Sequence, residues 1–155
     1  MPIRFVAMDT SLVRDLQAGA VDANGQPPER AVALEDGLPC RHCLADIERG
    51  EAFLVLAHRP FPAKQPYAEV GPIFVHAEPC KRGGGDDKLP PFLDSPHYIV
   101  RGYGANDRIV YGTGQVTPTR DIPAAAKALL ADSRVAYVHV RSASNNCYHC
   151  RIERA

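Results

Sequence analysis

The alternation of apolar and polar residues predicts a chain in which strands outnumber helices. Short β-branched or aromatic runs, each bounded by Gly, Pro, Asn or Asp, are typical of strands. Residues 97–103 and 108–113 flank Gly104-Ala105-Asn106-Asp107, a turn-forming sequence that predicts a β-hairpin. The full set of predicted strands covers residues 3–7, 31–34, 51–57, 73–76, 97–103, 108–113, 135–141 and 147–152.

Two segments have helical spacing instead. Residues 10–16 place apolar side chains on one face after a capping hydroxyl, and Gly19 ends the segment. Residues 119–130 are alanine-rich and carry Pro123 in the first turn. We therefore predict a single domain over residues 1–155 of the α+β class: an antiparallel-rich sheet with about two helices packed on one side.

Composition limits the classes of partner. The 155 residues include 18 Lys and Arg and 18 Asp and Glu, so no overall field attracts nucleic acid. Residues 1–80 carry 7 basic and 11 acidic side chains, and residues 81–155 carry the remaining 11 and 7. The mildly basic second half favours a small anionic ligand, although a solvated surface has the same composition.

The chain contains no apolar stretch of the roughly 18 residues that a membrane helix needs. Its first residues turn acidic too soon for a secretion signal, so we expect a cytoplasmic location with reduced thiols. The five cysteines are an odd number, which also argues against a closed disulfide framework. The glycine run in residues 81–91 predicts a flexible surface loop; no Lys-Ser/Thr pair follows it, and no nucleotide cofactor is indicated.

The most informative motif is Cys40-Arg41-His42-Cys43, followed after an apolar strand by His76 and Cys80. Zinc prefers four tetrahedral ligands from thiolate and imidazole, and the turn within Cys-x-x-Cys directs both sulfurs at one point. We predict one structural zinc ion in a knuckle hairpin, held by Cys40, Cys43, His76 and Cys80. Two other interpretations are open: three small buried cysteines with a hydrogen-bonded histidine, or thiol redox chemistry.

This order of ligands resembles treble-clef zinc fingers, in particular the type found in poly-ADP-ribose polymerases. There a Cys-x-x-Cys…Ile…Gly-Glu knuckle precedes a distant His-x-x-Cys, and here Ile47, Gly50 and Glu51 stand in the corresponding places. His76 and Cys80 are one residue further apart than that finger prefers, and Pro79 has to absorb the difference.

The last two predicted strands present a second candidate site. Alternation puts Ala136, Val138 and Val140 on an apolar face and leaves Tyr137, His139 and Arg141 on the other. In the last strand the same rule pairs Cys150 with Tyr148 and Ile152 in the core, and Cys147 with His149 and Arg151 outside. The predicted ligand-binding residues are Tyr137, His139, Arg141, Asn146 and Cys147.

The chemistry of these residues suits a small anion or covalent catalysis. Arg141 can clamp a carboxylate or phosphate, Asn146 can donate, and His139 can lower the pKa of Cys147. A solvated outer sheet face is the simpler interpretation of the same pattern. Three polar residues near strand ends are further candidates for such a pocket: Arg59, Glu69 and Arg101.

The chain as a whole resembles a bacterial family catalogued as domain of unknown function 1203. Segments that carry the resemblance include Pro39–Leu44, Gly71–His76, Arg101-Gly102-Tyr103 and Val138–Ala143. The family implies no activity. Three functional hypotheses stay open: a zinc-stabilised binding or structural module, a small-ligand enzyme or ligand-binding protein that uses the second site, and a metal-free interaction domain.

Overall fold

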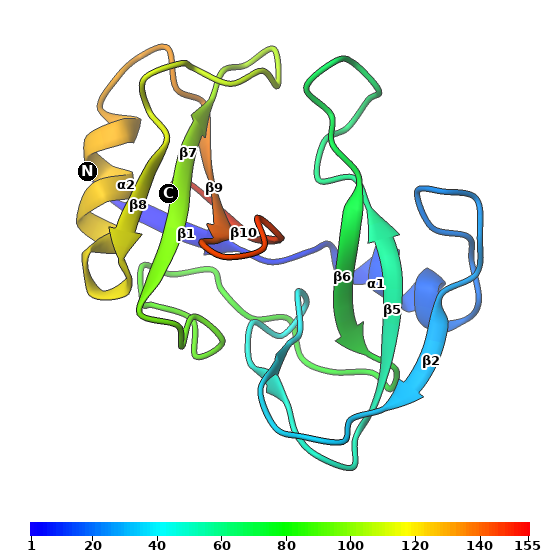
Figure 1. The fold of residues 1–155 in the computed structure, drawn as a ribbon. Helices are drawn as coiled ribbons and strands as arrows, with labels where there is room; N and C mark the ends of the chain where they lie inside the picture. Colours follow the sequence, from blue (N-terminus) through cyan, green and yellow to red (C-terminus); the bar gives the residue numbers. More distant parts are fainter.

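The computed structural model describes residues 1–155 and contains ten strands and two α-helices. Its sheets are antiparallel throughout, so the predicted α+β class is confirmed. Figure 1 shows two lobes side by side, each built on its own sheet. Neither helix has the length and apolar character needed to cross a membrane.

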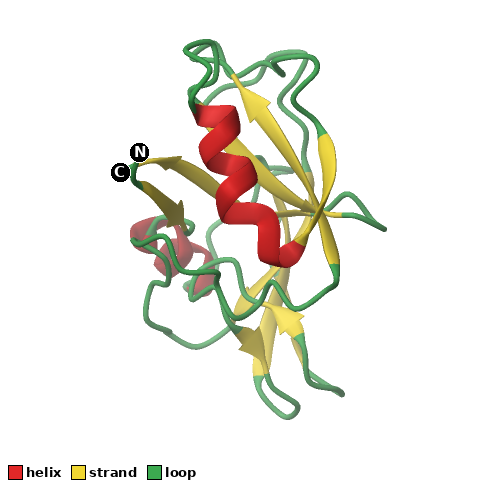
Figure 2. Ribbon diagram, turned by 90° about the vertical axis from the view of Figure 1, so that its left-hand side faces the viewer, coloured by secondary structure: helices red, strands yellow, loops and turns green.

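The large lobe holds a five-stranded sheet in the order β1-β10-β9-β7-β8. Its strands are β1 (Ile3–Val6), β7 (His97–Tyr103), β8 (Gln115–Pro118), β9 (Tyr137–Ser142) and β10 (Tyr148–Arg154). Helix α2 (Ile122–Leu130), preceded by a 3-10 turn η1 (Thr119–Asp121), packs across this sheet (Figure 2). Because β1 pairs with β10, the two ends of the chain meet, and the Ala155 amide donates to the Pro2 carbonyl.

The small lobe holds the three-stranded sheet β2-β5-β6 and helix α1 (Thr10–Gln17). Its strands are β2 (Glu29–Val32), β5 (Ala52–His58) and β6 (Gly71–His76). A two-stranded ribbon of β3 (Leu38–Pro39) and β4 (Asp46–Ile47) lies at its edge. Val13 and Leu16 of α1 share a core with Leu54, Ile73 and other apolar residues of this lobe.

The two helices are divided between two sheets, whereas the sequence predicted both on one side of a single sheet. The large lobe has its own core of 16 buried residues under α2, and the small lobe has one of 12 under α1. Each sheet has an apolar face that has to be buried, and one helix packs on each of these faces. The small lobe is inserted in the sequence between β1 and β7.

Two predicted strands need correction. Residues 108–113 are not a strand, because Thr113 donates its amide to the Val110 carbonyl and folds the segment back on itself. The predicted turn at 104–107 is present, but the partner of β7 is β8, which begins at Gln115. The strand expected at 31–34 is β2, which begins and ends two residues earlier.

Candidate functional site

The Cys-x-x-Cys motif forms a tight knuckle between β3 and β4. The Leu44 amide donates to the Cys40 carbonyl at 3.0 Å, and the Cys40 amide donates to the Ala45 carbonyl at 3.0 Å. Leu44 has a φ of 57°, a left-handed conformation that lets the chain reverse directly after Cys43. The turn therefore places both thiols on the same side of the ribbon, as the sequence predicted.

The other two candidate ligands come from β6 and the segment after it. The Arg41 amide donates to the Phe74 carbonyl at 3.1 Å, so the knuckle lies against β6. His76 is the last residue of β6, and Cys80 follows in the next loop. The Arg14 guanidinium of α1 donates to the Cys80 carbonyl at 2.8 Å and holds that loop in place.

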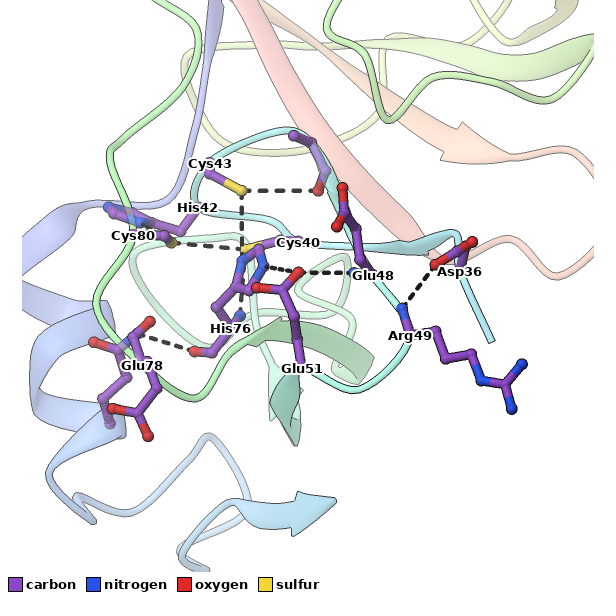
Figure 3. Close-up of polar contacts among 12 residues, drawn as sticks. Asp36, Cys40, His42, Cys43, Glu48, Arg49, Glu51, His76, Glu78 and Cys80 are labelled. Atoms are coloured by element: carbon purple, nitrogen blue, oxygen red, sulfur yellow. Dashed lines mark hydrogen bonds and ion pairs between the residues drawn. The ribbon is translucent and has the colours of Figure 1, made fainter. Parts of the chain in front are cut away.

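The four ligand atoms converge, and all lie within 4.8 Å of one another (Figure 3). Zinc at about 2.3 Å from sulfur and about 2.05 Å from nitrogen separates two tetrahedral sulfurs by about 3.8 Å, and a sulfur from a nitrogen by about 3.6 Å. The Sγ atoms of Cys40 and Cys80 are 4.0 Å apart, and Cys43 Sγ lies 3.6 Å from His76 Nδ1. All five cysteines are free, so the cluster is compatible with a zinc site.

A carboxylate supports His76 from outside the cluster. His76 Nε2 lies 3.3 Å from Oε1 of Glu51, while Nδ1 faces the sulfurs (Figure 3). A second-sphere carboxylate of this kind fixes the ring and the tautomer of a metal-binding histidine. Glu51 also accepts the Glu48 amide at 2.8 Å, which keeps the carboxylate in place.

His42, inside the motif, supports Cys80. It is buried, with Nδ1 3.0 Å from Cys80 Sγ and Nε2 2.9 Å from the Thr10 hydroxyl. Burial lowers its pKa, which favours the neutral ring. The neutral ring can donate one hydrogen bond to a thiolate, so His42 acts as a supporting group that the sequence analysis did not identify.

The pKa values of the three thiols in the cluster depend on one another. The Cys43 and Cys80 thiols hold the pKa of Cys40 far below its ordinary value. The Cys40 sulfur in turn raises the pKa of Cys43 to about 11 and also raises the pKa of Cys80. A bound Zn²⁺ would supply a positive charge that favours the thiolate form of all three.

The glycine run after Cys80 lies at the surface, but two of its glycines pack closely on other backbone segments. A Cβ on Gly83 would lie 2.0 Å from the Cys43 carbonyl oxygen, and one on Gly84 would lie 2.4 Å from the Phe5 carbonyl oxygen. The Gly83 amide donates to the His42 carbonyl at 2.9 Å. These glycines allow backbone to approach backbone, which explains the run without a ligand.

The second candidate site lies between the lobes. Tyr137, His139 and Arg141 are between 0% and 4% exposed, so the face they share is not a solvated outer face. Phe61, from the segment after β5, packs on it with its ring 5.2 Å from the His139 ring. The small lobe therefore covers the polar side of β9.

A β-bulge in β10 changes which side chains join that face. Tyr148 pairs with Arg141 and Cys150 with Val140, so His149 is the extra residue. Tyr148 consequently lies on the polar side, and His149 packs on the core side against Phe92 and Tyr98 at 5.3 and 5.2 Å. The sequence predicted the reverse for Tyr148 and His149, since alternation assumes an unbroken strand. The prediction that Cys150 belongs to the core is confirmed.

His139 occupies an aromatic cage, which we define as Phe61, Tyr103, Tyr137 and Tyr148. The four ring centroids lie 4.6–5.2 Å from the imidazole. Neither ring nitrogen has a hydrogen-bond partner, and burial holds the pKa far below its ordinary value. The thiol of Cys147 donates to the Asn145 carbonyl at 3.9 Å and makes no hydrogen bond to His139. The predicted His139–Cys147 pair is therefore not formed.

The other three predicted residues do come together. Arg141, Asn146 and Cys147 line a cavity of about 170 Å³ where the β9–β10 turn meets β6. Glu69, which the sequence suggested, lines it too and bridges Arg101 and Arg141. His58 and Tyr148 complete the wall and were missed, because nothing local in the sequence links the end of β5 to β10.

The chain belongs to the family described as "Protein of unknown function (DUF1203)", which matches residues 37–154. That range contains the four candidate zinc ligands and the whole lining of the cavity between the lobes. No curated protein and no solved structure matches the chain.

Proposed function

We propose that this DUF1203 protein is a binding module whose small lobe is stabilised by one structural zinc ion bound to Cys40, Cys43, His76 and Cys80. The observation that carries the proposal is the convergence of four ligand atoms at separations close to the edges of a zinc tetrahedron. A cage of four protein ligands leaves no open position for a substrate, so the metal has a structural role.

The position of the cluster supports this role. It ties the knuckle to the end of β6 and to the following loop, three segments that meet at one edge of the small lobe. The sheet of this lobe has only three strands, and every residue of β2 is exposed. Zinc binding contributes directly to folding where an apolar core is small.

We also propose a reducing, cytoplasmic location. Three free thiols whose sulfurs lie close together bind zinc only while they stay reduced. The alternative of a metal-free interaction domain remains a hypothesis, and metal analysis distinguishes it from ours. An enzymatic role for the face around His139 gains no support, since the imidazole contacts neither Cys147 nor any hydrogen-bond partner.

The test is elemental analysis of protein purified under reducing conditions without chelator. We expect about one zinc per chain, and loss of the metal in Cys43→Ser. Cys147→Ser is the matched control, because Cys147 lies outside the cluster, and it should retain the metal. Zinc below about a tenth of the protein concentration in the unmodified chain would refute the proposal.

A further inference from the structure

The cavity between the lobes has the features of a ligand site distinct from the metal cluster. Its walls come from the end of β5, the segment before β6, and the β9–β10 turn. Its polar lining includes His58, Glu69, Arg141, Asn146, Cys147 and Tyr148. The volume, about 170 Å³, is well under the roughly 300–1,000 Å³ of sites for drug-sized molecules, so the occupant has few heavy atoms.

Among the lining residues, Arg141 is the one with a buried polar atom that has no hydrogen-bond partner. Its side chain is 5% exposed. Nε donates to Oδ1 of Asn146 at 2.8 Å, and Nη2 donates to the Asn146 carbonyl at 2.9 Å and to Oε2 of Glu69 at 2.7 Å. Nη1 is buried and has no partner. An unused donor on a buried guanidinium costs free energy unless an acceptor meets it.

The charge around the cavity identifies the class of that acceptor. Arg141 lines the cavity, and Arg41, Arg59 and Arg101 each contact or adjoin a lining residue. Glu69 is the carboxylate among the lining residues. Glu69 gives one oxygen to Arg101 and the other to Arg141, both within 2.9 Å. Arg41 donates to the Tyr148 carbonyl and Arg59 follows His58; neither has a carboxylate within 4.0 Å.

A second observation points to the same excess of positive charge. The pKa of His58 is lowered to about 4, first by burial and then by Arg41 and Arg59. His58 packs on the Tyr148 ring at 5.7 Å and stays neutral at the cavity wall. The excess charge therefore resides on the arginines, which match carboxylate and phosphate oxygens.

We propose that this cavity binds a small oxyanion, the carboxylate or phosphate group of a ligand with few heavy atoms, with Arg141 as its anchor. Nη1 of Arg141, the guanidinium nitrogen with no partner in the protein, is the donor that the proposal assigns to the ligand. Asn146 uses Oδ1 to hold Arg141, which leaves its Nδ2 amide group as a second donor. Cys147 borders the bound group through its half-buried thiol. The proposal does not depend on zinc, whose ligands lie outside the cavity.

The direct test is an NMR titration of the ¹⁵N-labelled full chain, prepared with its metal. Sodium phosphate and sodium acetate are the probes, and sodium chloride at equal ionic strength is the control. We expect saturable shifts of the amides of residues 145–147 and of the Arg141 Nε–H. Shifts with phosphate alone assign a phosphoryl ligand, and shifts with acetate alone assign a carboxylate ligand. If neither probe gives saturable shifts there beyond those with chloride, the proposal is wrong.

The role of Arg141 is tested by Arg141→Lys, which keeps the charge and removes the planar fork. We expect the affinity for the better probe to fall at least about tenfold, as for loss of one charge-assisted hydrogen bond. Lys127→Arg, a cation on the far side of the large sheet, should leave the affinity unchanged. If a folded Arg141→Lys protein binds the better probe with unchanged affinity, Arg141 is not the anchor of the bound oxyanion.

A measurement on the unmodified chain is independent of whether that variant folds. Cys150 is 1% exposed, and the other three cysteines are the proposed zinc ligands. Alkylation of Cys147 by iodoacetamide is followed by mass spectrometry of its own peptide, so the result does not depend on zinc at the other three thiols. The bound probe should slow this alkylation several-fold at saturation, whereas chloride should not. Equal rates in all three salts would contradict the proposal.

Discussion

His76 and His139 lie on strands of different lobes, and the protein surrounds them in opposite ways. His76 directs Nδ1 at the metal cluster (Cys40, Cys43, His76 and Cys80) and Nε2 at Glu51, so both ring nitrogens have partners. His139 is more deeply buried and has four aromatic rings around it, and neither nitrogen has a partner. An imidazole is thus fixed by polar partners at His76 and by packing against aromatic rings at His139.

The difference has a consequence for charge. The pKa of His76 is raised, because Cys40 and Glu51 outweigh the effect of burial. Burial and the guanidinium of Arg141 lower the pKa of His139. The surroundings of His76 therefore favour a positive charge, whereas burial and the nearby arginine disfavour a charged His139. The following predictions test this contrast, in order of decreasing effect.

The largest effect is expected from Cys40→Ser, which removes a buried member of the cluster that we propose binds zinc. Four ligands share roughly 10–16 kcal/mol of zinc binding, so losing one should cost roughly 3 kcal/mol of unfolding free energy along with most of the zinc. Chemical denaturation with zinc analysis measures both. Cys150→Ser, equally buried but in the large core, is the control and should keep its zinc. A Cys40→Ser protein as stable as the Cys150→Ser protein would contradict the metal's structural role.

Next in size is Gly83→Ala. The added Cβ would meet the Cys43 carbonyl oxygen at 2.0 Å, so the knuckle has to move, and overpacking of this kind costs about 1–3 kcal/mol. We expect weaker zinc binding as well as a lower melting temperature. Gly71→Ala is the matched control, because its Cβ meets nothing within 4 Å. Equal melting temperatures for the two variants would show that the glycine run is not held on the knuckle.

His139→Phe tests the aromatic cage through pH. In the folded chain the lowered pKa keeps His139 neutral, while the unfolded chain takes up a proton below about pH 6.5, so stability is lost as the pH falls. Removing the imidazole should remove this loss. The advantage of the variant over the unmodified chain should grow by about 2 kcal/mol between pH 7.5 and pH 5.0.

The measurement is urea denaturation at the two pH values, with zinc present throughout. Phe61→Leu alters the same cage without a titratable group, and its effect should be the same at both pH values. An advantage of His139→Phe that does not change with pH would mean that His139 protonates inside the folded protein.

The smallest effect is expected from Glu51→Gln. This variant keeps an oxygen near His76 but loses the charge that orients the ring. Second-sphere changes lower metal affinity about 10–100-fold, and because the Glu51 side chain is 45% exposed we expect the lower end, about tenfold. Competition with a zinc chelator measures the affinity. Glu48→Gln, a neighbouring exposed carboxylate without a contact to His76, should bind zinc as the unmodified chain does. Equal affinities for both variants would remove Glu51 from the metal centre.

Sequence patterns predicted the structure correctly where it depends on residues close together in the chain. The Cys-x-x-Cys spacing predicts the knuckle because four residues can form the turn without help from the rest of the chain. The helix with Pro123 in its first turn is found as α2, since proline placement and alanine-rich composition act within one element. The assignment of Cys150 to the core also holds, because residues 150 and 152 follow the bulge and face Val140 and Val138.

Sequence patterns gave wrong predictions where one extra residue changes the alternation of side chains along a strand, or where segments distant in the sequence meet. The extra residue at His149 places Tyr148 in the aromatic cage, and alternation alone gives no sign of it. The polar face of β9 has the pattern of a solvated surface, yet Phe61 and Glu69 from the small lobe cover it. Burial of this face depends on the insertion of a second lobe, which no single strand encodes.

By itself, then, the sequence predicted the α+β class, the knuckle and the four residues of the Cys/His cluster, because turn geometry acts within the knuckle and zinc-ligand chemistry limits which distant residues can join it. Only the tertiary structure decided that the strands form two sheets, that Arg141 is buried with an unused donor, and that a cavity separates the β9–β10 turn from β6. Those features arise from contacts between residues as far apart as Glu69 and Arg141, and chain folding alone brings them within 2.7 Å.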